Sequence, residues 1–170
     1  MKILIAYTSK HGVTAECARM LAEKIEGNAL VELVDMNRAT PADPDGYDAV
    51  VLGSSVRFGR LSGAVKKYIK ANMNALNGMK CGVFFCCGFP DEFEEYVRTQ
   101  IPKGFNASLG VNYFGGELKP KKIKGIERLI VYAMRKSVTE HDFEDGHYKG
   151  SLPEILPEHI NLMADKILGR

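Results

Sequence analysis

The chain alternates short apolar runs with segments whose apolar residues recur at helical spacing. Five runs have the length of a buried strand: Ile3–Tyr7, Ala29–Val34, Tyr47–Gly53, Cys81–Cys87 and Ser108–Phe114. The third of these is almost wholly apolar after its second residue, which is typical of a central strand in a parallel sheet. The first run is too short to span a membrane.

Amphipathic helices are predicted after the first, third and fourth runs and near the end of the sequence. The first helix has the apolar residues Cys17, Ala18, Leu21, Ala22 and Ile25 and stops at Gly27. The second has Leu61, Ala64, Val65, Tyr68, Ile69 and Met73 and stops at Gly78. A shorter helix carries Phe93, Tyr96 and Val97. The last runs from about Pro153 to Leu168, with an inward face of Ile155, Leu156, His159, Leu162 and Met163.

Strands that alternate with helices predict an α/β fold whose parallel sheet is covered by helices on both faces. Right-handed crossovers between five strands favour a doubly wound sheet with the order 2-1-3-4-5. A chain of 170 residues has the length of one domain, so residues 1–170 are expected to form a single domain.

The loop between the first strand and the first helix is the strongest candidate for a binding site. It comprises Ser9, Lys10, His11, Gly12, Val13 and Thr14. The unpaired N–H groups of the helix and the two hydroxyls can together hold a phosphate. Hydrogen bonds to a charged group, at about 1.5–3 kcal/mol each, outweigh the helix dipole, at about 0.3–1 kcal/mol. A plain Ser/Thr turn that caps the helix is the structural alternative.

Other phosphate-binding and doubly wound proteins need residues that this chain lacks. Neither the Gly-rich loop of NTPases, with its Lys and Ser/Thr, nor Gly-x-Gly-x-x-Gly occurs between the strand and the helix. A response regulator needs acidic residues after the first strand, where Ala6 and Tyr7 stand. A small tyrosine phosphatase needs an Arg six residues after a Cys, and none of the four cysteines has one.

Composition narrows the function further. The net charge of only +2 argues against a general nucleic-acid binder, and no signal peptide is recognisable at the N-terminus. The four cysteines show no disulfide or zinc spacing, so buried, reduced thiols in a cytoplasmic protein are expected. They are Cys17, Cys81, Cys86 and Cys87.

The segment Ser9–Thr14 resembles the phosphate loop of the flavodoxin superfamily, although His11 stands where that loop commonly has a hydroxyl or small residue. The block Tyr47–Gly59, with its Arg-aromatic-Gly, is similar to the menaquinone-dependent protoporphyrinogen dehydrogenases, which are flavodoxin-like FMN enzymes. The likeness extends to Met79 and returns weakly after the fifth strand. It implies a flavodoxin-like fold, for which the order 2-1-3-4-5 is itself best known, and FMN as the cofactor.

Two further loops are expected to frame the flavin ring, because they open at the same edge of the sheet as the phosphate loop. They comprise Ser54, Ser55, Val56, Arg57, Phe58 and Gly59, and Cys87, Gly88, Phe89 and Pro90. Phe58 and Phe89 are the candidates for the apolar walls of the ring site, and core packing is the alternative for either. Gly59 tolerates the backbone dihedrals needed for a turn toward the ring. Cys86 and Cys87 are expected to be strand residues rather than redox groups.

Arg57 is the candidate catalytic residue. Its guanidinium is suited either to stabilise a reduced, anionic flavin ring or to hold a substrate carboxylate in bidentate fashion. A surface arginine without a role is the alternative. No side chain in the sequence stands out as a general base, so the chemistry is expected to come from the cofactor.

The residues from Glu117 to Gly150 exceed what a strand-to-helix connection needs. Within them, residues 119–136 hold seven basic residues and one acid, with apolar residues on one helical face. Such a helix can contact an anionic membrane surface or an acidic partner, or pack on its own domain. The acidic and histidine residues between Glu140 and His147 are expected to form a solvated loop rather than a metal site.

The sequence therefore predicts an FMN-dependent oxidoreductase, with a porphyrinogen as possible substrate and a quinone or a protein as redox partner. A flavodoxin-type electron carrier without its own substrate is the second hypothesis. The basic helix and the net charge speak against it, because such carriers usually present an acidic face. A binding module that has lost the flavin is the third. The predicted location is the cytoplasm, with peripheral contact at the inner face of the membrane as an open alternative.

Overall fold

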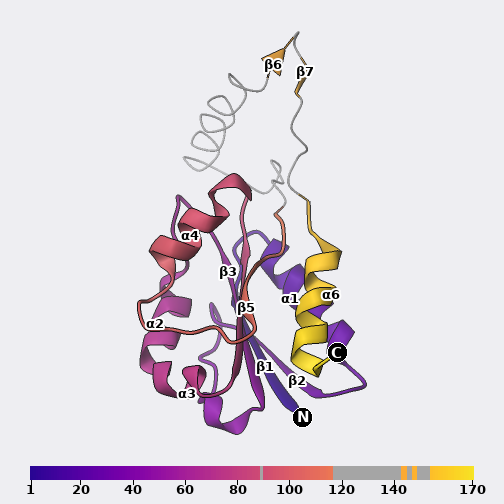
Figure 1. The fold of residues 1–170 in the computed structure, drawn as a ribbon, viewed down its shortest axis with the longest axis vertical. Helices are drawn as coiled ribbons and strands as arrows, with labels where there is room; N and C mark the ends of the chain where they lie inside the picture. Colours follow the sequence, from indigo (N-terminus) through magenta and orange to yellow (C-terminus); the bar gives the residue numbers. More distant parts are fainter. Residues whose placement is uncertain (89, 117–142, 145–146, 149–153) are drawn as a thin grey trace.

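The fold is that of a doubly wound α/β protein, seen in a computed structural model that describes residues 1–88, 90–116, 143–144, 147–148 and 154–170. The main sheet has five parallel strands in the order β2-β1-β3-β4-β5 (Figure 1). Its strands are β1 (Lys2–Thr8), β2 (Leu30–Asp35), β3 (Ala49–Ser55), β4 (Lys80–Cys86) and β5 (Gly110–Tyr113). The predicted fold class and strand order are confirmed, because the order reverses between β1 and β3 as expected.

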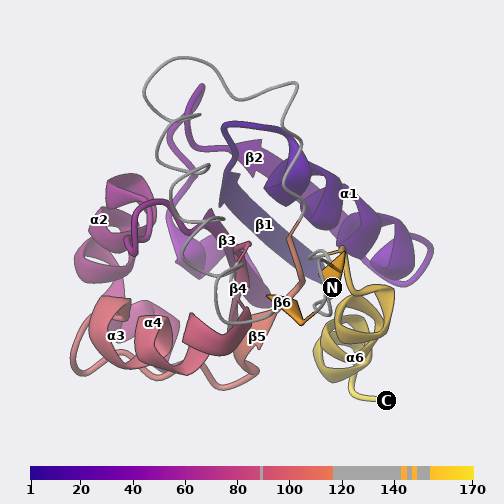
Figure 2. The same ribbon diagram turned by 90° about the horizontal axis from the view of Figure 1, so that it is seen from above.

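Helices cover both faces of the sheet (Figures 1 and 2). They are α1 (Val13–Ile25), α2 (Gly63–Ala71), α3 (Met73–Asn77), α4 (Phe93–Gln100) and α6 (Pro157–Leu168), with short 3-10 turns at Pro44–Gly46 and Pro90–Glu92. The helices α1 and α6 pack on one face and α2, α3 and α4 on the other, around two separate clusters of buried apolar side chains. A short antiparallel pair, β6 (Phe143–Glu144) and β7 (His147–Tyr148), completes the described elements.

The second predicted helix is interrupted, contrary to the sequence pattern. It forms two helices, α2 and α3, with Asn72 between them at φ −117° and ψ 21°. The side-chain amide of Asn72 donates a hydrogen bond of 3.1 Å to the carbonyl oxygen of Tyr68. Asparagine commonly competes with the helical backbone in this way, and the apolar periodicity alone does not report it.

The last helix begins later than predicted, and its inward face differs. Helix α6 starts at Pro157, where the missing N–H of proline costs nothing. Its buried residues are Ile160, Met163, Ala164 and Ile167, whereas Leu162 is 56% exposed. The prediction that Leu162 faces inward is therefore wrong. It assumed that the helix already included Ile155, which instead pairs with Gly115 in an isolated bridge.

The carboxyl ends of the five strands meet at one edge of the sheet, so the loops that follow them are neighbours there. Close packing positions two of these loops. A side chain at Gly53 in β3 would lie 2.3 Å from the ring of Phe84, which itself stacks on Phe114 at 4.4 Å between centroids. The β3 and β4 loops therefore start from strands that glycine and aromatic packing hold tightly together.

None of the helices that the structure describes is both long and apolar enough to cross a lipid bilayer. Residues 119–136, for which the sequence raised membrane contact, lie outside the described residues. The same holds for most of the acidic and histidine residues between Glu140 and His147.

Candidate functional site

A cavity of about 100 Å³ opens where the loops after β1, β3 and β4 converge. We call it the phosphate-loop cavity. The first loop contributes Ser9, Lys10, His11, Val13 and Thr14, and the second contributes Ser55, Val56 and Arg57. The end of β4 and the residues near it contribute Cys86, Cys87, Gly88 and Gly116. The structure thus brings together most of the site residues predicted from the sequence.

The loop before α1 has the features of an anion seat. Gly12, at φ 97°, is the N-cap residue and supplies no side chain to the first N–H groups of the helix. The hydroxyl oxygen of Ser9 accepts a hydrogen bond of 3.2 Å from the N–H of Gly12. Thr14 is only 1% exposed and lines the cavity from the first turn of α1. Uncapped N–H groups beside two hydroxyls form the donor set that a phosphate requires.

The loop after β3 closes in a tight turn. Arg57 and Arg60 exchange two backbone hydrogen bonds of 2.9 Å, and both residues between them, Phe58 and Gly59, have positive φ angles of 50° and 71°. Such a turn has the backbone geometry of the tight turns that join two strands, and glycine suits its second central position. Ser54, near the end of β3, holds the loop in place, because its buried hydroxyl accepts a hydrogen bond of 3.1 Å from the N–H of Ser62.

Phe58 occupies an unfavourable backbone conformation. A bulky residue at positive φ is uncommon, and the strain typically costs on the order of 1–3 kcal/mol. The residue is nevertheless 53% exposed, and the guanidinium of Arg57 lies 5.5 Å from the centroid of its ring. The ring therefore does not fill the core, which removes that alternative for Phe58. Phe58 lines a second, larger cavity at this edge of the sheet, described below, and a strained aromatic residue at such a place is typical of a binding role.

Replacing Phe58 by asparagine is expected to separate stability from flavin binding. Asparagine accepts positive φ, so the free energy of unfolding of the flavin-free protein should rise by about 1 kcal/mol. Loss of the ring should weaken flavin binding by about two- to tenfold. Thermal unfolding and a fluorescence titration measure the two quantities. Phe58→Tyr keeps both the strain and the ring and serves as the control. A Phe58→Asn protein with unchanged flavin affinity would remove the ring from the site.

The β4 side of the cavity is held by close backbone contacts. A side chain at Gly116 would lie 2.0 Å from the carbonyl oxygen of Cys87, and the N–H of Cys87 donates a hydrogen bond of 3.2 Å to Gly115. Phe89 lies outside the described residues, and Pro90 begins the 3-10 turn that leads into α4.

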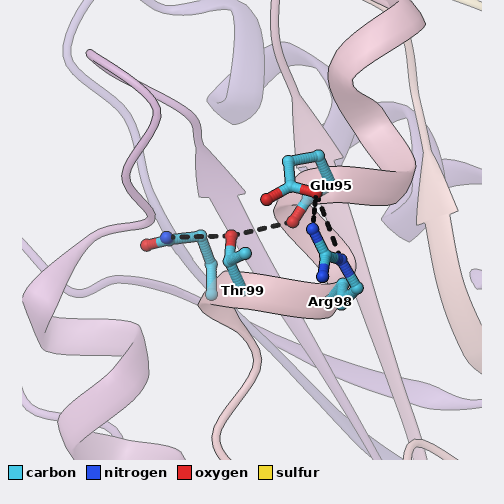
Figure 3. Close-up of polar contacts among 4 residues, drawn as sticks. Glu95, Arg98 and Thr99 are labelled. Carbon is cyan, nitrogen blue, oxygen red and sulfur yellow. Dashed lines mark hydrogen bonds and ion pairs between the residues drawn. The ribbon is translucent and has the colours of Figure 1, made fainter.

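The helix α4 that follows this turn is stabilised by contacts between its own residues. Arg98 is paired with Glu95, and the Thr99 hydroxyl donates a hydrogen bond of 2.7 Å to the carbonyl oxygen of Glu95 (Figure 3).

The cysteines are buried and reduced, as predicted. The thiol of Cys86 lies 3.7 Å from that of Cys17, and this hydrogen bond together with burial raises the pKa of Cys86 well above its usual value. Burial also raises the pKa of Cys81, to about 12. Because the thiolate is the reactive form, neither group has the environment of a redox-active cysteine.

We therefore expect Ellman's reagent at pH 8 to react with all four thiols in concentrated urea but only very slowly with the native protein. The raised pKa values keep the native thiols Cys81 and Cys86 protonated at this pH. Rapid release of the coloured thiolate from native protein would contradict the burial of these side chains.

A second, larger cavity of about 530 Å³ adjoins the first and is lined by the loops after β1, β2 and β3. We call it the arginine-lined cavity. Its cationic lining residues are Lys10, Arg38, Arg57 and Arg60, and Ser9, Lys10, Ser55 and Arg57 also line the phosphate-loop cavity. Sequence reasoning missed Arg38, because the loop after β2 was not connected with the site. It also missed Arg60, because the residues assigned to the site in the loop after β3 ended at Gly59. The rule that loops after parallel strands share one edge would have indicated Arg38.

The fold and these cavities define a class: a doubly wound α/β protein with a phosphate-sized site at the point where the strand order reverses. Residues 4–145 match the family model described as a flavodoxin domain, and the chain belongs to this family. A short-chain flavodoxin associated with a non-canonical PDU bacterial microcompartment shares the fold at a TM-score of 0.60, with 13% identity over 99% of this chain and 97% of its own. The two-electron reduced flavodoxin of Megasphaera elsdenii shares it at 0.59, with 14% identity over 99% of each chain.

A curated relative is the protoporphyrinogen IX dehydrogenase [quinone] of Escherichia coli K12. It is 30% identical over 80 residues, which are 46% of this chain and 44% of the relative. The match thus spans less than half the length of that protein.

FMN is the cofactor of flavodoxin domains, and family membership assigns it to this chain. The residues present fit the phosphate end of FMN. Hydrogen-bond donors come from the uncapped first turn of α1 and from the hydroxyls of Ser9 and Thr14. The side chains of Lys10 and His11 also line this cavity and carry donors. A volume of about 100 Å³ suits the phosphate and the chain next to it rather than a whole ligand, since complete small-molecule sites usually measure about 300–1,000 Å³.

Proposed function

We propose that this protein is an FMN-dependent oxidoreductase that oxidises a porphyrinogen and passes the electrons to a quinone. The observation that carries the proposal is the arginine-lined cavity beside the flavin site, with Arg57 on the wall that the two cavities share. A pure electron carrier needs a flavin site alone, whereas an enzyme needs room for a substrate next to it. The partial similarity to the Escherichia coli dehydrogenase suggests the substrate and acceptor classes.

The positions of the residues support the following assignment of roles. Ser9–Thr14 hold the phosphate, the loops Ser54–Gly59 and Cys87–Pro90 frame the ring, and Ser54 also accepts a hydrogen bond from the N–H of Ser62 that braces the β3 loop. When bound, FMN supplies a ring that accepts electrons and hands them on. Each pair of hydrogen atoms removed from the porphyrinogen reduces one quinone to its quinol. Arg57 provides a permanent positive charge where the flavin and the substrate meet.

A flavodoxin-type electron carrier is the second candidate. The exposure of Phe58 favours it, because this residue is 53% exposed and offers an aromatic surface to a protein partner beside the arginine-lined cavity. The fold neighbours at the higher TM-scores are themselves flavodoxins.

Anaerobic oxidation of protoporphyrinogen IX with a menaquinone analogue separates the two candidates. The enzyme hypothesis predicts protoporphyrin fluorescence that grows only when protein, flavin and quinone are all present. Flavin-free protein is the matched control for spontaneous oxidation. Flavin-loaded protein that produces no more fluorescence than this control, yet exchanges electrons with a protein partner, would establish the carrier instead.

The location in the cell and the role of residues 119–136 remain proposals from the sequence. We propose a cytoplasmic protein whose basic segment brings it to the anionic inner surface of the membrane, where a lipid-soluble quinone resides. Co-sedimentation with vesicles containing phosphatidylglycerol, compared with vesicles of phosphatidylcholine alone, tests this contact. Equal, negligible binding to both would exclude it.

A further inference from the structure

A further inference concerns the ligand of the arginine-lined cavity, and it rests on the proposed function. At about 530 Å³ it has the volume of a complete small-molecule site, unlike the phosphate-loop cavity. It lies beyond Arg57, between the loops after β1, β2 and β3. A ligand in this cavity would therefore be separate from the phosphate of FMN but adjacent to it.

The charges that line the cavity select an anion. Lys10, Arg38, Arg57 and Arg60 face one carboxylate among the described lining residues, that of Asp35. Arg38 pairs with Asp35 at 3.5 Å between Nε and Oδ2, whereas no carboxylate in the described part of the chain forms an ion pair with Arg60. Guanidinium groups present paired donors that match the two oxygens of a carboxylate.

Thr8 gives an independent indication of a ligand. This last residue of β1 is 4% exposed and lines the cavity, and its hydroxyl has no hydrogen-bond partner among the described residues. Buried polar atoms are nearly always paired, because leaving one unpaired costs free energy. A ligand oxygen that enters the cavity would satisfy this hydroxyl.

The walls of the cavity are fixed in position before any ligand arrives. The side-chain amide of Asn37 donates to the carbonyl oxygen of Ser9 at 3.0 Å and ties the β2 loop to the β1 loop. The two backbone hydrogen bonds of the Arg57–Arg60 turn fix the opposite side. Phe58 and Leu61 add apolar surface, so the ligand combines acidic groups with an apolar body.

We propose that the arginine-lined cavity binds the carboxylate side chains of a tetrapyrrole, with Arg38 and Arg60 as the anion contacts and the Thr8 hydroxyl as a further donor. The apolar body of the tetrapyrrole then extends past Arg57 and Phe58 toward the flavin. Arg38, Arg60 and Thr8 thus position the substrate, and none of them lines the phosphate-loop cavity.

The test measures binding of protoporphyrin IX, a dicarboxylate, to flavin-loaded protein in detergent by fluorescence quenching. Its dimethyl ester is the matched ligand without charge. Arg38→Gln and Arg60→Gln should each raise the dissociation constant of the free acid by about tenfold. Thr8→Val should weaken binding severalfold yet raise the unfolding temperature of the ligand-free protein, because it removes an unpaired buried hydroxyl. Lys70→Gln, in the last turn of α2, is the matched control for lost charge.

The proposal predicts tight binding of the free acid, weak binding of the ester and unchanged FMN affinity in all of these variants. Absence of free-acid binding, equal affinity for the ester, or affinities unaffected by Arg38→Gln and Arg60→Gln would each overturn it. Displacement of FMN by the porphyrin would also overturn it, since the ligand would then occupy the flavin site. If binding behaves as predicted but porphyrinogen is not oxidised, the cavity assignment stands and the enzymatic function fails.

Discussion

An Arg57→Ala protein is expected to keep its flavin but to lose about a hundredfold or more in turnover with its true substrate. Arg57 lies on the wall that the two cavities share, where a positive charge reaches both the flavin and a substrate. Removing one well-placed group that stabilises developing charge commonly costs a factor of about 10²–10³ in rate. Steady-state rates with porphyrinogen and a quinone analogue, together with a flavin titration, measure the two effects.

Arg57→Lys is the informative control, because lysine keeps the charge but loses the paired donors of the guanidinium. Turnover that survives in Arg57→Lys would identify the charge as the essential property. Turnover that falls as far as in Arg57→Ala would identify bidentate binding of a carboxylate. Full turnover in Arg57→Ala itself would contradict any catalytic role and leave Arg57 as a surface residue.

A Thr14→Ala protein is expected to bind FMN about ten- to a hundredfold more weakly. Thr14 is 1% exposed and lines the cavity from the first turn of α1. Loss of one hydrogen bond to a charged phosphate costs about 1.5–3 kcal/mol, which corresponds to that change in the dissociation constant. Quenching of FMN fluorescence on binding to flavin-free protein gives the constant directly.

Thr14→Ser retains the hydroxyl and should stay close to the wild-type affinity. The Thr14→Ala side chain still fits the buried position, and circular dichroism of the flavin-free variant checks that the fold is kept. An unchanged dissociation constant for FMN in a folded Thr14→Ala protein would remove this hydroxyl from the phosphate site.

Much of the fold could be predicted because the signals are local and strong. Each of the five strands is a short run dominated by apolar residues, and the helix after the first run shows a clear apolar face from Cys17 to Ile25. Handedness and strand number then leave few topologies. The phosphate loop was found for the same reason, since strand, small polar loop and helix follow directly in sequence.

The remaining features depend on contacts between distant segments or on the backbone, which periodicity does not report. Asn72 breaks a helix whose apolar pattern continues through Met73. Helix α6 starts only at Pro157, and its buried face is Ile160, Met163, Ala164 and Ile167, so that Leu162 is exposed. Phe58 takes a positive φ that its residue type disfavours. Arg38 reaches the site only because β2 is the neighbour of β1 in the sheet.

Comparison of FMN with riboflavin measures whether the loop from Ser9 to Thr14 holds the phosphate of FMN. The two flavins differ only in that phosphate. Titrations of flavin-free protein should show FMN binding at least about a hundredfold more tightly than riboflavin, since the phosphate receives several charge-assisted hydrogen bonds. Equal affinity for the two flavins would show that this loop does not hold the phosphate, and no binding of either would show that the protein has no flavin site.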